Sequence, residues 1–267
     1  MAAELARRGL RDHRRALVGW CLGVAVYVAL IASIFPSIEG SPELDELIAS
    51  YPDVLKSLFG LESGASITSG AGYLDAELFG LMLPLLVLVL AIGSGARAIA
   101  GEEDAGRLEL VLAYPLRRRD AVLAKGAAVA VEVLVVCAVA GFVLLAFDPL
   151  VGLDLPTTRV LEALASLVAL GLLHGWLALA VGATVPSRAL AIGLPAGLAA
   201  SAYLVNGLHG LAGWLDPFRF LSSFWLVGSS PLGGGVDLVG VLVVLVAALA
   251  VLAAGAWLIE RRDLQTP

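Results

Sequence analysis

The sequence has few charged residues and few cysteines. Charged side chains make up 15% of its 267 residues and hydrophobic residues 60%, whereas soluble domains are about a quarter charged. A water-soluble globule of this size cannot hide so much apolar surface, which excludes a typical cytosolic enzyme and a disordered chain. Cys21 and Cys137 both fall in apolar runs. We interpret them as small buried hydrophobes rather than as a disulfide or a metal pair.

Basic tracts and nucleotide-binding loops are also missing. Only 2 of the 17 basic residues are lysines, the formal net charge is −6, and no basic run is long enough for a nucleic-acid surface. The phosphate-binding pattern G-x-x-x-x-G-K-[ST] does not occur, so the chain cannot bind ATP in that way. The residues indicate no catalytic group and no metal site.

Long apolar runs dominate what is present. A helix that crosses a bilayer needs roughly 20 apolar residues. Six stretches meet this length, at about 16–35, 78–99, 126–147, 161–185, 189–208 and 236–259. We therefore predict an all-α polytopic membrane protein with six transmembrane helices in one domain, residues 16–267. The first run is too long for a cleaved signal peptide and is expected to stay as an anchor.

The basic residues predict the orientation of these helices. Fourteen of the 17 fall on the side of the two termini, and only Lys56, Arg159 and Arg219 fall on the other. The positive-inside rule places both termini in the cytoplasm of a multi-pass cell-membrane protein. Eight acidic residues lie between Glu39 and Glu77, which makes the external loop 36–77 acidic.

Two segments outside the spans have a membrane character. Residues 1–15 have the pattern of an amphipathic interfacial helix, with five arginines on one face that suit lipid phosphates. This helix is either a topology anchor or an elbow that also contacts a cytosolic partner. Residues 209–234 are aromatic but interrupted by proline, which indicates either a re-entrant segment on the outer side or a plain aromatic belt.

The cytoplasmic loop 97–125 carries the most informative pattern. Acidic residues begin a short helix, an apolar stripe follows, and Pro115 ends it before a basic cluster. The residues of this pattern are Glu102, Glu103, Gly106, Leu108, Val111, Leu112, Pro115, Arg117, Arg118 and Lys125. Such a helix either lies on lipid or packs against a partner.

This loop resembles that of the membrane subunits of ABC-2 type exporters, and the tail from Glu260 to Leu264 is similar as well. Arg107 departs from the family pattern, in which a small hydroxyl residue is common. The resemblance implies that the stripe is a coupling helix seated on a separate ATP-binding cassette subunit, which would hold ATP and Mg²⁺. It also implies a second six-span copy, identical or paralogous, and export of an amphipathic or lipid-like substrate such as a drug, an antibiotic or a lipid.

Two other functions are compatible with parts of the sequence: an intramembrane protease and a membrane anchor of another complex. Residues 102–107 match the EExxxR pattern of CAAX-type intramembrane proteases, and Gly93-Ser94-Gly95 with His174 resembles a serine protease motif. Protease chemistry needs its groups gathered inside the membrane, whereas these acids lie in a charged loop. The chain could also be a membrane anchor of another complex.

Two polar residues inside spans are candidates for a substrate path. Glu132 lies about 10 Å along the helix from Lys125, and a carboxylate within the membrane is either functional or hydrogen-bonded to a neighbouring helix. His174 lies near the middle of the fourth span. It is either a satisfied core histidine or part of a relay.

Overall fold

A computed structural model describes residues 2–52, 55–56, 66–104, 117–228 and 231–261. The longer helices are α1 (Ala2–Ile34), α2 (Pro42–Ala49), α5 (Met82–Ala96), α8 (Arg118–Val151), α9 (Thr157–Thr184), α10 (Arg188–Leu208) and α12 (Leu238–Leu258). The short ones are η1 (Phe35–Ser37), α4 (Gly70–Leu74), η2 (Asp75–Phe79), η3 (Arg97–Gly101), α6 (Glu102–Asp104), η4 (Asp216–Leu221), α11 (Ser223–Val227) and η5 (Ile259–Arg261). Within these ranges there is no strand.

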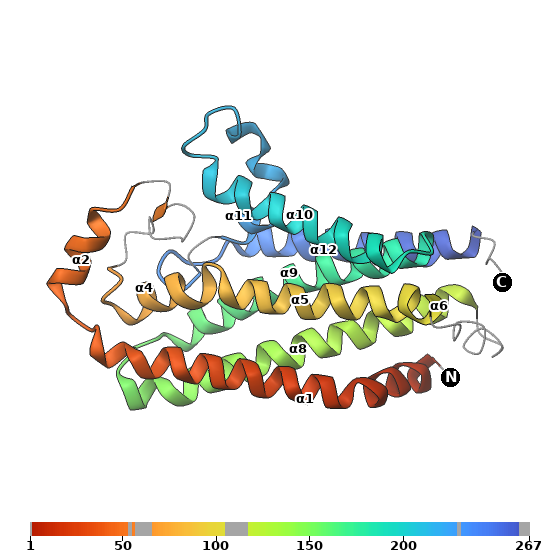
Figure 1. Ribbon diagram of the computed structural model, residues 1–267, viewed down its shortest axis with the longest axis horizontal. Coiled ribbons are helices and arrows are strands. Elements are labelled where there is room, and N and C mark those ends of the chain that lie inside the picture. Colours follow the sequence, from red (N-terminus) through yellow and green to blue (C-terminus); the bar gives the residue numbers. More distant parts are fainter. Residues whose placement is uncertain (1, 53–54, 57–65, 105–116, 229–230, 262–267) are drawn as a thin grey trace.

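Six helical stretches are long and apolar enough to cross a membrane, and together they form an all-α bundle. They cover Arg14–Ser37, Gly70–Asp104, Arg118–Val151, Thr157–Thr184, Arg188–Leu208 and Leu238–Arg261. The six-helix membrane fold predicted from the sequence is confirmed. The start of α1, α6 and η5 lie at one end of the bundle, which we name the terminal end. Helices α2, α4 and α11 lie at the opposite end (Figure 1).

Helix α9 is the centre of the bundle, because α5, α8, α10 and α12 all pack against it, while α1 packs on α8 at the edge. Small residues allow these close approaches, as is usual where lipid removes the hydrophobic drive between helices. A Cβ atom built on Gly95 of α5 would lie 2.0 Å from the carbonyl oxygen of Gly175 on α9. Any side chain at position 95 would therefore collide with the backbone of α9 at this contact.

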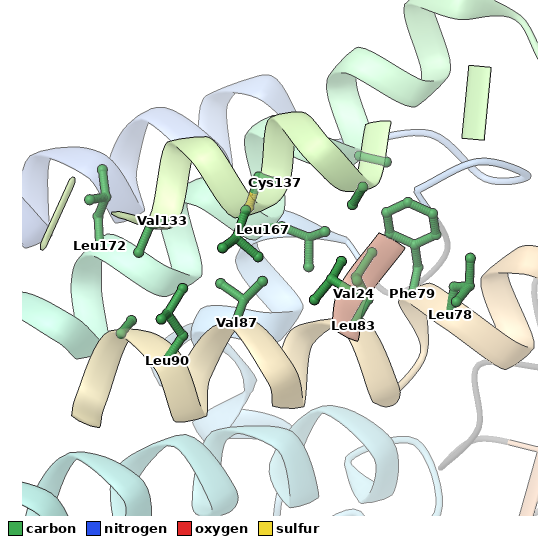
Figure 2. Close-up of a cluster of buried hydrophobic side chains, with 14 of the residues drawn as sticks. Val24, Leu78, Phe79, Leu83, Val87, Leu90, Val133, Cys137, Leu167 and Leu172 are labelled. Atoms are coloured by element: carbon green, nitrogen blue, oxygen red, sulfur yellow. The ribbon is translucent and has the colours of Figure 1, made fainter. Parts of the chain in front are cut away.

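The largest apolar cluster lies where α5, α8 and α9 meet. Figure 2 shows Val87 and Leu90 of α5 facing Val133 of α8 and Leu167 of α9, and each of these side chains is at most 3% exposed. The apolar side chains on the outward faces of α1, α10 and α12 are exposed, among them Val26, Leu198 and Val246. This is the burial pattern expected of a bundle surrounded by lipid rather than by water.

Two boundaries differ from the expectations. Residues 2–34 form one uninterrupted helix, so no break at residue 15 separates the expected interfacial helix from the first span. No proline interrupts this stretch, and nothing else in it ends a helix. The second span starts earlier than expected, at Gly70, because α4, the π-helical η2 and α5 follow one another closely.

The segments at the opposite end are short helices between turns. Helix α2 begins at Pro42, with Ser41 as its N-cap, although the serine side chain makes no capping hydrogen bond. The segment 209–228 holds η4 and α11 and leaves Trp214, Phe220 and Leu221 strongly exposed. The guanidinium of Arg219 lies over the rings of Phe220 and Trp225, 4.9 and 5.2 Å from their centroids.

Candidate functional site

An ionic contact ties α6, at the end of the second span, to α8 at the terminal end. Lys125 Nζ on α8 lies 2.5 Å from Glu102 Oε2 on α6 and also donates to the carbonyl oxygen of Ala98. The lysine side chain is 11% exposed and the glutamate 29%. Glu102 comes shortly before residues 105–116, and Lys125 follows them on α8. The contact therefore joins the two helices that flank the expected coupling helix.

A second polar contact lies deeper in the same helix interface. Ser94 of α5 donates a hydrogen bond to the carboxylate of Glu132 on α8, and Arg97 Nη2 donates to Ser94 Oγ at 3.1 Å. Glu132 is 5% exposed. The π-helical segment η3 begins at Arg97 and ends just before Glu102. Its backbone thus connects the two polar contacts along one side of α8.

The other residues of the predicted loop site are only partly described. Gly106, Leu108, Val111, Leu112 and Pro115 lie outside the described residues. Glu103 is half-buried next to Glu102, Arg117 is the exposed N-cap of α8, and Arg118 is half-buried in the first turn of that helix. Arg119 Nε lies 3.7 Å from Glu260 Oε1, which brings the start of α8 to the end of the sixth span.

His174 and Ser94 are engaged with different partners. His174 on α9 is 3% exposed, and its Nδ1 lies 2.9 Å from the carbonyl oxygen of Leu170 on the same helix. Ser94 is bonded to Glu132 and Arg97, as described above. Neither His174 nor Glu132 lines either of the two large apolar grooves described below.

A large apolar groove lies between α5 and α10. Its volume is about 440 Å³. Its walls are Leu81, Pro84, Leu85, Leu88, Val89, Ile92 and Gly93 on one side and Ile192, Ala196, Ala199, Ala200, Tyr203 and Phe224 on the other. Ligand sites of drug size are typically about 300–1,000 Å³ and mainly apolar. The groove has the size and chemistry to receive an apolar or amphipathic molecule.

Sequence reasoning did not find this groove. Its lining residues look like any other apolar positions of two spans, and only the separation of α5 from α10 makes them a cavity. A second groove of about 480 Å³ lies between α1 and α5, along Ala16, Gly19, Gly23 and Met82. Gly19 and Gly23 follow the small-xxx-small spacing of packed membrane helices, which was a readable signal.

A comparison with known protein families decides the class of the chain. Residues 9–259 match the family model described as the C-terminal domain of the multidrug efflux system permease Rv1217c. The chain belongs to this permease family. No curated protein matches the chain significantly.

Membership and fold together make this chain a multi-pass transporter permease rather than an enzyme. The permease has no cluster of three His, Cys, Asp or Glu residues that could hold a metal ion, within the ranges that the structure describes. Of the EExxxR match at residues 102–107, the structure describes only 102–104, and there Glu102 is paired with Lys125.

Proposed function

We propose that this permease is the membrane subunit of an ATP-driven ABC exporter that moves an amphipathic or lipid-like substrate. The groove between α5 and α10 is the observation that carries the substrate class, because its lining is almost entirely apolar and is wide enough for a drug-sized molecule. The printed name of the family model, a multidrug efflux permease, supports the same class.

A separate ATP-binding cassette subunit supplies the energy in this proposal and binds the ATP and Mg²⁺. The expected docking element is the coupling helix with Leu108, Val111 and Leu112, outside the described residues. The contacts Glu102–Lys125 and Ser94–Glu132 support this role, because each joins the second span, before that element, to α8, which follows it. A displacement of the loop by the ATP-binding subunit would then be transmitted to the second and third spans together.

A second copy of the six-span unit completes the exporter. Gly193 and Gly197 on α10 have the spacing of close-packing helices, as do Gly19 and Gly23 on α1. A Cβ atom built on any of these four would meet no atom of the described chain within 4 Å. These faces of α1 and α10 have room for another helix.

The terminal end faces the cytoplasm of a cell-membrane protein in this proposal. The supporting observation is that the basic residues of the N-terminal helix, of α8's first turn and of η5 all lie at the end that carries α6 (Figure 1). Membrane lipids would then contact the arginines of residues 7–15.

A pull-down tests the partner subunit. Each leucine buried in a partner groove contributes roughly 1.5–3 kcal/mol. Leu108→Asp with Leu112→Asp should therefore detach the ATP-binding subunit without disturbing membrane insertion. Leu47→Asp on the exposed side of α2 is the matched control and should leave binding intact. If the double variant still pulls down the ATP-binding subunit, the assignment of residues 108–112 as a coupling helix is refuted.

Reconstitution tests the transport activity itself. The permease and its ATPase, placed together in proteoliposomes, should hydrolyse ATP faster when an amphipathic drug is added. They should also move that drug in an ATP-dependent way. A substitution that fills the groove, Ala196→Trp, should abolish the stimulation while basal hydrolysis continues. Equal stimulation of the Ala196→Trp variant would contradict the groove as the substrate site.

A further inference from the structure

The groove between α5 and α10 offers no partner for a charged group. Among the described residues that line it, Tyr203 alone carries a polar side chain, and none is acidic or basic. Burying an unpaired charge in such surroundings costs far more than burying an apolar group or a polar group that is hydrogen-bonded. The groove therefore selects against ionised molecules, whatever their apolar part.

A small polar pocket adjoins the groove on the side of α4 and α11 (Figure 1). The two cavities share Pro84, Tyr203 and Phe224, and the two rings meet edge to face with centroids 5.4 Å apart. The pocket has a volume of about 30 Å³, which is room for one or two waters. A hydroxyl or a primary amide at the end of a longer molecule takes about the same room.

Two neutral polar side chains line this pocket from α9 and α10. The hydroxyl of Ser166 is within hydrogen-bond distance of the carbonyl oxygens of Glu162 and Val227, at 3.3 and 3.4 Å, so it offers a ligand only its lone pairs. The carboxamide of Asn206 makes no hydrogen bond within the described part of the chain, and it can both donate and accept. A ligand group that donates and accepts at once, as a hydroxyl or an amide does, matches this pair.

Charged residues on the neighbouring elements are bound to other groups. Arg159 Nη1 lies 3.4 Å from Glu162 Oε2 near the start of α9. Asp75 in η2 is 1% exposed and accepts the backbone N–H groups of Leu232 at 3.0 Å and Gly233 at 2.8 Å. None of these three charged side chains lines the pocket. A charged end of a bound molecule would therefore be desolvated there without a counter-ion, which is strongly unfavourable.

We propose that the groove and the pocket form one site for an uncharged amphipathic molecule. Its apolar part lies between α5 and α10, and its hydroxyl or amide end passes the ring pair and lies between Ser166 and Asn206. The inference rests on the proposed export function, because it specifies the substrate class of the same site. Asn206 is the specificity-determining residue, since its carboxamide exchanges hydrogen bonds with the polar end. Ionised drugs and phospholipids, whose phosphate is charged, are excluded.

A series of fluorescent probes that differ only at one end tests this proposal on the permease alone. Each probe is a dansyl group on a decyl chain that ends in a hydroxyl, a methyl, a trimethylammonium or a sulfonate group. Saturable binding is measured on the purified permease in phosphatidylcholine nanodiscs, with empty nanodiscs as the baseline. We expect the hydroxyl probe to bind about tenfold more tightly than the methyl probe. It should bind about 100-fold more tightly than either charged probe.

Three outcomes of this series overturn the proposal: no saturable binding of the hydroxyl probe, equal affinity for a charged probe, or equal affinity for the methyl probe. These comparisons use the unaltered permease, so they do not depend on the folding of a variant. Ala196→Trp then locates the binding, because a bulky side chain at position 196 fills the groove. Unchanged affinity of the hydroxyl probe for Ala196→Trp places the site elsewhere and overturns the proposal as well.

Substitutions of Asn206 test its role in specificity. Asn206→Leu should abolish the preference for the hydroxyl over the methyl probe. Asn206→Asp keeps the size of the side chain and supplies a counter-ion, so the trimethylammonium probe should bind about tenfold more tightly than to the unaltered permease, whereas the sulfonate probe should gain nothing.

Gly210→Asp is the matched control for the added charge. Gly210 follows the end of α10, lines neither cavity, and has room for a Cβ atom with no atom of the described chain within 4 Å. An equal gain for the trimethylammonium probe in Gly210→Asp, or no gain in Asn206→Asp, overturns the role of Asn206. Failure of ATP-dependent transport in proteoliposomes would refute the proposed export function, whereas the probe affinities are measured without ATP and still decide this inference.

Discussion

The hydrogen bond from Ser94 to Glu132 allows a quantitative test of what a buried membrane carboxylate does. Both side chains are buried, at 7% and 5% exposure, and they join α5 to α8. Ser94→Ala removes the donor and leaves the carboxylate in place. Glu132→Leu removes the carboxylate and fills its place with an apolar side chain. Ser94→Ala leaves the buried carboxylate without this donor, whereas Glu132→Leu leaves the Ser94 hydroxyl with Arg97 as its remaining partner.

The expected magnitudes follow from this difference. Leaving a buried acceptor without its donor costs about 1–3 kcal/mol, whereas in Glu132→Leu the Ser94 hydroxyl still accepts a hydrogen bond from Arg97. Measured hydrogen bonds between membrane helices average about 0.6 and reach about 1.7 kcal/mol. We therefore expect Ser94→Ala to lower the free energy of unfolding by about 1.5 kcal/mol, and Glu132→Leu by less. The double variant should resemble Glu132→Leu.

The assay is a double-mutant cycle on the purified permease, with unfolding followed by detergent titration. Because the double variant is expected to resemble Glu132→Leu, the coupling free energy should equal the cost of Ser94→Ala, about 1.5 kcal/mol. Additive losses, within about 0.3–0.5 kcal/mol, would refute the direct interaction.

A transport assay on Glu132→Gln then separates the two roles of this residue. A change in transport at normal yield assigns Glu132 to a substrate or proton path. A loss of folded yield alone assigns it to helix pairing. Normal transport and normal yield remove it from both roles.

Three further predictions concern topology, packing and the terminal ion pair. In topology, an impermeant thiol reagent added outside should label Glu43→Cys and miss Arg117→Cys, and the reverse pattern would invert the proposed orientation. In packing, Gly95→Leu should prevent accumulation of folded protein, because its Cβ would lie 2.0 Å from a carbonyl oxygen of α9. Gly93→Leu is the control, because its Cβ meets nothing within 4 Å of the described chain. It should fold normally and change transport by narrowing the groove between α5 and α10. Lys125→Met leaves its carboxylate partner without the lysine and should uncouple drug-stimulated from basal ATP hydrolysis; unchanged stimulation would show that the pair does not transmit motion.

The number and approximate position of the spans could be predicted from the sequence. A membrane helix satisfies its own backbone hydrogen bonds, so an apolar run of sufficient length determines a span without reference to any neighbour. The pair Ser41-Pro42 is likewise a local signal for the start of a helix, and α2 begins at Pro42. The continuous α1 was not predicted, since the change from amphipathic to apolar residues after Arg15 marks a change of surroundings and leaves the helix unbroken.

Only the tertiary structure decided which polar residues meet. Asp75 binds amides 157 and 158 positions away, and Ser94 bonds to Glu132 across two spans. In sequence, Asp75 was one acid among eight in an external loop, and Ser94 was one small residue among many. Which helix faces touch depends on close approaches such as Gly95 on Gly175, and these depend on the shapes of both surfaces at once. A span is determined by its own residues, whereas a groove or a contact between two helices exists only when separate segments are placed together.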